Sequence, residues 1–181
     1  MNTQYPQAYK EYLLFFQAER DYFECHEVME EYWKEHPDDE RSRTYVGLIQ
    51  MAVALYHHRR GNQAGARKML DSALRNLEPQ HVAALGLDDA ALRERLTTRL
   101  AALDAEDGAA AAFADLDLPV RDAALLAECQ AACAERGLEW GRPSELADAE
   151  LVHKHTRRDR SDVIRERELQ KQLRQDKGAA L

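Results

Sequence analysis

The 181-residue chain has few of the residues that interrupt helices, with eight glycines and five prolines. Because glycine and proline mark the turns between short strands, their scarcity favours long helices. β-branched residues never alternate with polar ones over the length of a strand, whereas alanine, leucine, glutamate and arginine, which are strong helix formers, are abundant. We therefore expect an all-α fold.

The sequence also lacks an apolar leader and any apolar run near the ~20 residues that cross a bilayer. Its cysteines, Cys25, Cys129 and Cys133, are odd in number, which argues for a reducing compartment. Cys129 and Cys133 lie one helical turn apart, and we interpret them as small core residues rather than a redox or metal pair. These absences predict a cytoplasmic protein without a membrane partner.

Charge is distributed unevenly along the chain. The net charge is −8, but residues 151–181 contain nine lysines and arginines against five acids, so they carry +4 and residues 1–150 carry −12. An acidic body argues against a protein that coats nucleic acid. The basic end can dock on the acidic body, join two copies in a homodimer, or bind an acidic partner.

Apolar residues at helical spacing predict a series of helices. Prolines at 37 and 79 end two similar hairpins, which favours a compact antiparallel bundle of two tetratricopeptide-like hairpins, too few for a solenoid. Residues 138–149 are expected to be irregular, with Trp140 packed on the body. The expected helices span residues 7–20, 21–36, 40–60, 63–77, 88–103 and 120–136, and a final charged helix begins near 147 or 159 and ends near 175.

The same pattern divides the chain into three parts. A four-helix core occupies residues 1–80, a fifth helix and an acidic linker occupy residues 81–119, and a helical extension with a basic tail occupies residues 120–181. The linker assignment rests on residues 104–119, which are small, acidic and end at a proline.

Polar residues on the apolar faces of the second and third helices form the candidate site. An unpaired polar group costs roughly 2–7 kcal/mol when it is buried, so these groups must pair with one another, with water or with a ligand. The candidate cluster consists of His26, Glu27, Glu30, Trp33, Gln50 and His57.

Two interpretations of this cluster remain open. In one, His26, Glu30 and His57 bind a catalytic metal, with Glu27 as general base and Glu27 or Gln50 supporting the ligands. In the other, which we favour, the groups form an internal hydrogen-bond network that fixes the register of two helices. The motif is HExxE rather than the HExxH of zinc proteases, and the third helix has no ExxH. We therefore assign no catalytic residue, metal or cofactor.

A second candidate site is a basic segment near the C-terminus. Its functional interpretation is a phosphate or nucleic-acid contact, and the alternative is an ion-paired helix docked on the acidic body. No aromatic residue lies between these basic residues to stack on bases, which favours the alternative. The residues are Lys154, His155, Arg157, Arg158 and Arg160. The cations that end the third helix, His58, Arg59 and Arg60, are expected to complement its dipole.

The chain contains none of the phosphate-loop, dinucleotide, CxxC or nucleophile-elbow motifs. The run HEVMEEYW, followed by GLIQMAVALYHHRRGNQAGARKML, resembles a bacterial family of domains of unknown function, family 309. The resemblance covers residues 10–78 and rests on His26, Glu27, Glu30, Trp33, Gly47, Gln50, His57, Asn62, Gly65 and Ala66 in order, with Met29 where the pattern has leucine. It implies a small helical bundle in which these two helices pair, and it implies no activity.

We therefore expect a non-enzymatic helical module that binds a protein partner. The alternatives are a metal-dependent hydrolase built on the polar cluster and, less favoured, association with nucleic acid through the basic segment.

Overall fold

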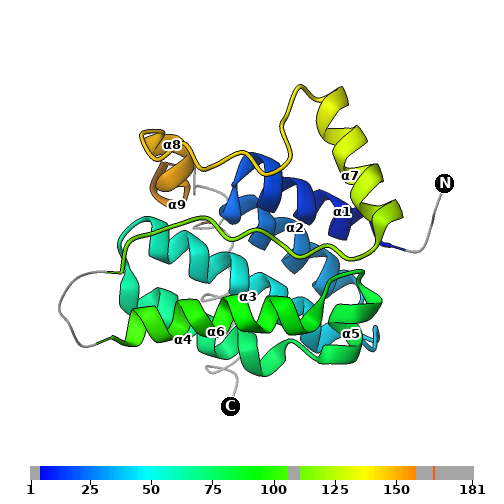
Figure 1. Ribbon diagram of the computed structural model, residues 1–181, viewed down its shortest axis with the longest axis horizontal. Coiled ribbons are helices and arrows are strands. Elements are labelled where there is room, and N and C mark those ends of the chain that lie inside the picture. The colour runs from blue at the N-terminus through cyan, green and yellow to red at the C-terminus, as the bar shows by residue number, and fades with distance from the viewer. Residues whose placement is uncertain (1–4, 106–110, 158–164, 166–181) are drawn as a thin grey trace, which may run out of the picture.

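The computed structural model describes residues 5–105, 111–157 and 165, which form packed helices joined by irregular segments (Figure 1). In these ranges no strand occurs, and Leu87 and Val120 form an isolated bridge. The expected all-α fold is confirmed. Each helix of the described part is too short or too polar to cross a membrane.

Both predicted hairpins are present. The central helix α3 packs against α2 on one side and α4 on the other, which explains why its sequence is apolar on several faces. The Asp21 side chain accepts the backbone N–H of Glu24 and begins α2, a cap typically worth about 1 kcal/mol. The tetratricopeptide-like geometry of the hairpins stays a prediction. The helices are α1 (Gln7–Leu14), α2 (Tyr22–Glu35), α3 (Ser42–Arg59) and α4 (Gln63–Asn76).

Aromatic side chains from α1, the turn after it and the start of α2 occupy the centre of the core. The rings of Tyr12 and Phe16 lie 5.7 Å apart, those of Phe16 and Tyr22 lie 5.1 Å apart, and all three side chains are fully buried. The Tyr12 hydroxyl donates to the Leu48 carbonyl at 2.9 Å, so its polar tip is satisfied inside the core. This bond also joins α1 to α3.

Gly47 allows α3 to approach the end of α4 closely. A Cβ at this position would lie 2.9 Å from Cδ2 of Leu77, a distance that real contacts do not reach. Gly47 is one of the residues that carry the family resemblance, and the structure gives it a packing role.

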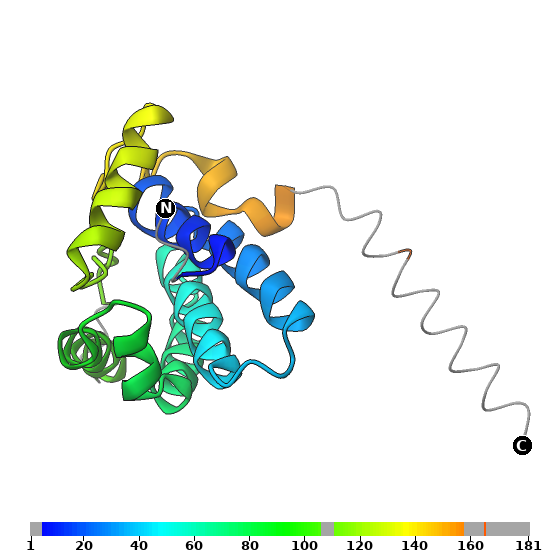
Figure 2. The ribbon, with the colours of Figure 1, turned by 90° about the vertical axis from the view of Figure 1, so that its right-hand side faces the viewer.

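The rest of the chain wraps around the two hairpins. α4 ends just before Pro79, as expected, and Pro79 also begins an additional short helix, since its fixed φ suits the first helical position. α7 packs on α1, and Figure 2 shows α8 and α9 on the other side of α1, above α2. Most of the final helix expected to reach residue 175 falls outside the described residues. The elements are α5 (Pro79–Ala84), α6 (Asp89–Asp104), α7 (Ala123–Glu135), α8 (Ala149–Val152) and α9 (Lys154–Arg157).

Residues 111–119, which we call the strap, run in an extended conformation between α1 and α6 (Figure 1). The segment is irregular, as its composition suggests, but it packs into the core. Leu116 is 4% exposed and Leu118 is 6% exposed. The strap therefore lies between the first helix and α6 and contributes two leucines to the core.

Candidate functional site

The part of the candidate cluster on α2 is assembled in the structure. Nδ1 of His26 lies 3.1 Å from a Glu27 carboxylate oxygen, and Nε2 lies 3.1 Å from a Glu30 oxygen. One ligand atom from each of these residues falls within 4.8 Å of the others, and no other such group occurs in the described ranges. The cluster is about one-third exposed, and Lys34 neutralises part of it through an ion pair of 3.0 Å with Glu30. The arrangement can hold a cation, and it also forms a satisfied network without one.

The other three members of the predicted cluster have partners of their own. The Trp33 indole N–H donates to Ser42 at 2.8 Å. Gln50 accepts a hydrogen bond from a side-chain amide on α4, also at 2.8 Å. Nδ1 of His57 accepts from the guanidinium of Arg60, just beyond the end of α3, and His57 is not among the residues that converge at His26. The structure therefore brings together His26, Glu27 and Glu30, but not the expected set of His26, Glu30 and His57.

The described residues of the basic segment turn toward the bundle. Nζ of Lys154 lies 2.7 Å from Asp21 and 3.0 Å from Glu24. The backbone N–H of His155 donates to the Tyr56 hydroxyl at 3.0 Å. The Arg157 side chain, Arg158 and Arg160 lie outside the described part of the chain. Lys154 and His155 thus have the contacts expected of a docked helix.

A buried polar centre that sequence reasoning missed lies at the end of the first helix. There α1 continues as a π-helical turn (Phe15–Glu19) and ends at Arg20, which adopts a left-handed conformation with φ of 53°. Such a conformation costs roughly 1–2 kcal/mol for a residue with a Cβ. Arg20 is 2% exposed, and its guanidinium donates to the Leu116 carbonyl at 2.9 Å and the Asp117 carboxylate at 2.7 Å. π-helical turns occur often at functional sites.

Gln17 and Arg20 together bind both the backbone and the side chains of the strap. The Gln17 amide donates to the Asp117 carboxylate at 2.7 Å, while its oxygen accepts the Leu118 N–H at 2.9 Å. Burial alone would raise the pKa of the Asp117 carboxyl, but the hydrogen bonds from Arg20 and Gln17 outweigh it and bring the pKa below 3.8. Asp117 is therefore an ionised partner of Arg20 at neutral pH.

Asp115 is the second acidic contact of the strap. Its carboxylate accepts the Tyr22 hydroxyl at 2.7 Å and the Ser144 N–H at 2.6 Å. Burial raises its pKa, but the bonds from Ser144 and then Tyr22 bring the net pKa below the ordinary value. Through this one carboxylate the strap is joined both to the first helical hairpin and to the C-terminal extension.

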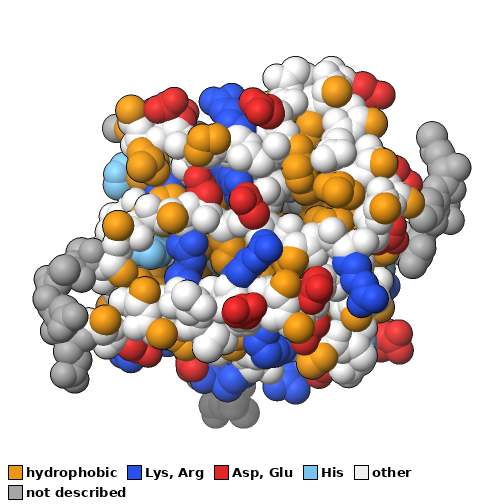
Figure 3. All heavy atoms as spheres, viewed as in Figure 1, with side chains coloured by type: hydrophobic (Ala, Val, Ile, Leu, Met, Phe, Trp, Pro, Cys, Tyr) orange, Lys and Arg blue, Asp and Glu red, His pale blue; other side chains and the backbone are white. Residues whose placement is uncertain are grey.

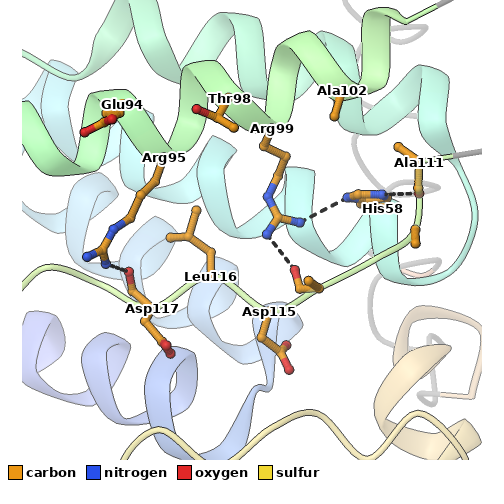
Figure 4. A pocket seen from close by; sticks show the side chains of 12 residues that line it. His58, Glu94, Arg95, Thr98, Arg99, Ala102, Ala111, Asp115, Leu116 and Asp117 are labelled. Carbon is orange, nitrogen blue, oxygen red and sulfur yellow. Dashed lines mark hydrogen bonds between the residues drawn. The ribbon is translucent and has the colours of Figure 1, made fainter.

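The opposite side of the strap is bound from α3 and α6 (Figure 4). Nε2 of His58 donates to the Ala111 carbonyl at 2.8 Å, and a guanidinium N–H of Arg99 donates to the Ala114 carbonyl at 2.5 Å. Arg95 donates to the Asp117 carbonyl. These donors bind main-chain oxygens, which every residue of an extended segment presents.

Two cations expected to complement the helix dipole have different roles. His58 is 5% exposed, and Nδ1 accepts an Arg99 N–H at 3.1 Å, so the ring is the neutral Nε2–H tautomer. Burial lowers the pKa of His58, and the Arg99 charge lowers it further. The Arg59 guanidinium lies over the Tyr22 ring at 4.6 Å and donates to the Arg20 carbonyl at 2.6 Å. Both residues therefore organise the interior rather than a solvated helix end.

Comparison with known proteins identifies the family. The family described as a domain of unknown function, DUF309, matches residues 9–69. The uncharacterized protein YpuF of Bacillus subtilis (strain 168) is 46% identical over 166 residues, which cover 91% of this chain and 93% of that protein. The chain belongs to the DUF309 family. The family resemblance read from residues 10–78 is confirmed.

The match to a second relative covers fewer residues. An uncharacterized protein of Aquifex aeolicus (strain VF5) is 33% identical over 54 residues, which cover 30% of this chain and 16% of that protein. No solved structure matches the chain. The DUF309 match includes Arg20 and the cluster on α2, whereas the strap and α6 lie beyond residue 69.

Proposed function

We propose that this DUF309 protein is a non-catalytic helical module that binds an extended acidic segment of a protein partner on the face formed by α1, α3 and α6. The observation that carries the proposal is that this face already holds an extended acidic segment, the strap of its own chain.

The contacts define what such a face recognises. Carbonyl oxygens are bound by His58 and by arginines of α6, while two apolar side chains, Leu116 and Leu118, enter the core. The Asp117 carboxylate between them is bound by Arg20. Binding an extended chain through its backbone, with specificity from alternate side chains, is a recurring mode of peptide recognition. The expected partner motif is a leucine pair that alternates with aspartate.

A partner competes with the chain's own strap. A tethered segment has an effective concentration on the order of millimolar, so a partner with the same sequence displaces little of it. A partner must therefore bind the face more tightly than the strap does, or bind when the strap is weakened. This competition suggests the experiment.

The test uses a fluorescein-labelled peptide with the sequence of residues 111–121, AAFADLDLPVR, and fluorescence anisotropy. Asp117→Asn in the chain weakens its own strap, while the peptide still supplies the carboxylate for Arg20. Since Asp117 is 67% exposed, its ion pair is worth at most about 1 kcal/mol, which predicts roughly fivefold tighter peptide binding. Asp104→Asn, on the same protein but outside the face, is the matched control and should leave the affinity unchanged.

The peptide itself provides a second control. Replacing both of its aspartates with asparagine should weaken binding to the Asp117→Asn chain, because Arg20 and Tyr22 lose their carboxylate partners. Equal affinity of the two chain variants for the peptide, or no binding to either, would contradict the proposed function.

A second candidate function is favoured by the three converging groups on α2. His26, Glu27 and Glu30 could bind a transition metal and activate water for hydrolysis, with Glu27 taking the ligand position expected of His57. The test is the metal content, by plasma mass spectrometry, of protein purified without chelator. A stoichiometric metal that His26→Ala removes would support this function, and metal-free protein of full stability would contradict it.

Two further expectations remain proposals. We place the module in the cytoplasm, which its three buried cysteines without a disulfide support. Association with nucleic acid through the basic segment is not favoured, because the Lys154 and His155 side chains contact the bundle. A salt titration at low ionic strength would test it, since phosphate contacts weaken steeply with salt.

A further inference from the structure

A hollow of about 620 Å³ remains between α6 and the strap. Ligand pockets typically measure about 300–1,000 Å³ and combine apolar walls with a few convergent polar groups. Alanines from α6 and the strap form much of this wall. Polar side chains join them, and Figure 4 shows how they are arranged: His58, Glu94, Arg95, Thr98, Arg99, Asp115 and Asp117.

Two arginines and three carboxylates, those of Glu94, Asp115 and Asp117, line the hollow, so the direction in which each side chain points decides which charge a ligand meets. Arg95 and Arg99 are four residues apart, so they project from the same side of α6. Both donate to strap carbonyls, and neither is in ion-pair contact with a carboxylate of the described residues. Asp115 and Asp117 belong to the strap but extend away from α6, toward the first hairpin (Figure 4). Basic and acidic side chains lie side by side over this part of the surface (Figure 3).

Glu94 also borders the hollow, and its orientation keeps it apart from Arg99. In Figure 4 the Glu94 carboxylate points away from the Arg99 guanidinium and lies beyond Arg95. An anion between the two arginines would therefore meet two guanidinium groups and the Thr98 hydroxyl before it met this carboxylate.

Arg99 is held in place but incompletely satisfied. One N–H donates to Nδ1 of His58 at 3.1 Å, another donates to the Ala114 carbonyl, and the guanidinium lies 5.8 Å from the centre of the Phe113 ring. Its Nε is buried and has no hydrogen-bond partner among the described residues. A buried polar atom without a partner costs about 1–3 kcal/mol, so the present contacts leave Arg99 incompletely satisfied.

The bond with His58 fixes the direction of the Arg99 side chain. Because Nδ1 of His58 accepts and Nε2 donates to the strap, a neutral ring orients the guanidinium without adding a competing charge or an anionic acceptor. An arginine held in this way is preorganised for an oxyanion, which it can bind through two parallel N–H bonds.

We propose that the hollow between α6 and the strap binds a small organic anion, a carboxylate or phosphate carried on a compact apolar body, with Arg95 and Arg99 as its charge partners. The alanine walls and Leu116 contact the apolar body, and Thr98 supplies a hydroxyl. This site differs from the proposed peptide-binding face in ligand class and needs the strap in place, so it does not rest on the proposed function.

The experiment measures binding to the full chain by isothermal titration calorimetry with four probes. Phenyl phosphate and benzoate carry the two candidate anions, benzamide is the uncharged match of benzoate, and inorganic phosphate lacks the apolar body. At least one of the two aromatic anions should bind with a Kd below about 1 mM, and benzamide and inorganic phosphate should bind at least tenfold more weakly. A higher affinity of phenyl phosphate than of benzoate identifies a phosphate site, and the reverse identifies a carboxylate site.

Arg95→Gln is the decisive variant, because Arg95 is exposed and its loss should leave the fold intact. We expect its affinity for the bound anion to fall about tenfold, the loss of one charge-assisted hydrogen bond. Arg67→Gln is the matched control, since Arg67 is exposed and pairs with Asp104 outside the hollow. Absence of binding by both aromatic anions, equal affinity for benzamide, or equal losses in the two variants would overturn the proposal.

Discussion

Leu116→Ala tests whether the strap is an integral part of the bundle. Leu116 is 4% exposed, and Leu→Ala in a packed core costs 2–5 kcal/mol, with smaller values where neighbours can relax into the space. Because the strap lies at the edge of the core, we expect a loss of about 2–3 kcal/mol. For a chain of this size, 1 kcal/mol shifts Tm by about 2–4 °C, so the melting temperature should fall by about 5–10 °C.

Urea unfolding followed by far-ultraviolet circular dichroism gives the change in free energy, and a thermal melt gives Tm. The matched control is Leu146→Ala, because Leu146 is 60% exposed. The control should change stability by less than about 0.5 kcal/mol. A loss below about 0.5 kcal/mol for Leu116→Ala as well would show that the strap only tethers its two ends, and would refute the account of the polar centre around Arg20.

Three further outcomes follow from the same contacts. Burial holds the pKa values of His57 and His58 below the ordinary 6.5, so the unfolded chain takes up protons first as the pH falls. The free energy of unfolding should therefore be highest above about pH 6.5 and decline below it. Urea titrations at pH 7.5 and 5.5 measure this difference, and His58→Asn should make it smaller. Burial, and then the neighbouring Cys133 thiol, raises the pKa of Cys129 to about 12. A thiol reagent at pH 8 should therefore modify Cys129 in urea and leave it unmodified in the native protein. Rapid labelling of the native protein would contradict the buried position of Cys129. His26→Ala should change the free energy of unfolding by less than about 1 kcal/mol in metal-free protein, because the network of His26, Glu27 and Glu30 is partly exposed. A loss above about 2 kcal/mol would show that this network anchors the fold.

Helix positions could be predicted because they depend on local patterns. The apolar spacing in α3 and the cap at Asp21 act within a few residues, and the structure places helices there. The cluster on α2 was found for the same reason, since His26 and Glu30 are one turn apart on a single helix. The position of His57 relative to this cluster could not be predicted, because it depends on how α2 and α3 are rotated against each other, and a single sequence does not specify that rotation.

The polar centre depends on contacts between distant parts of the chain. Arginine is normally exposed, so nothing in the sequence marked Arg20 or Arg59 as buried. The strap did carry a signal, because Leu116 and Leu118 alternate with aspartates before a proline, a pattern typical of an extended segment with one buried face. Its acidic composition obscured that alternation and favoured a linker.

Amide hydrogen exchange of the Leu118 N–H tests the proposed displacement most directly, because this group donates to Gln17 only while the strap is seated. The measurement compares the Asp117→Asn chain with and without saturating AAFADLDLPVR peptide. If the peptide takes the place of the strap, the chain's own Leu118 N–H should exchange faster when the peptide is bound. Peptide binding that leaves this N–H equally protected would place the peptide elsewhere and contradict the account.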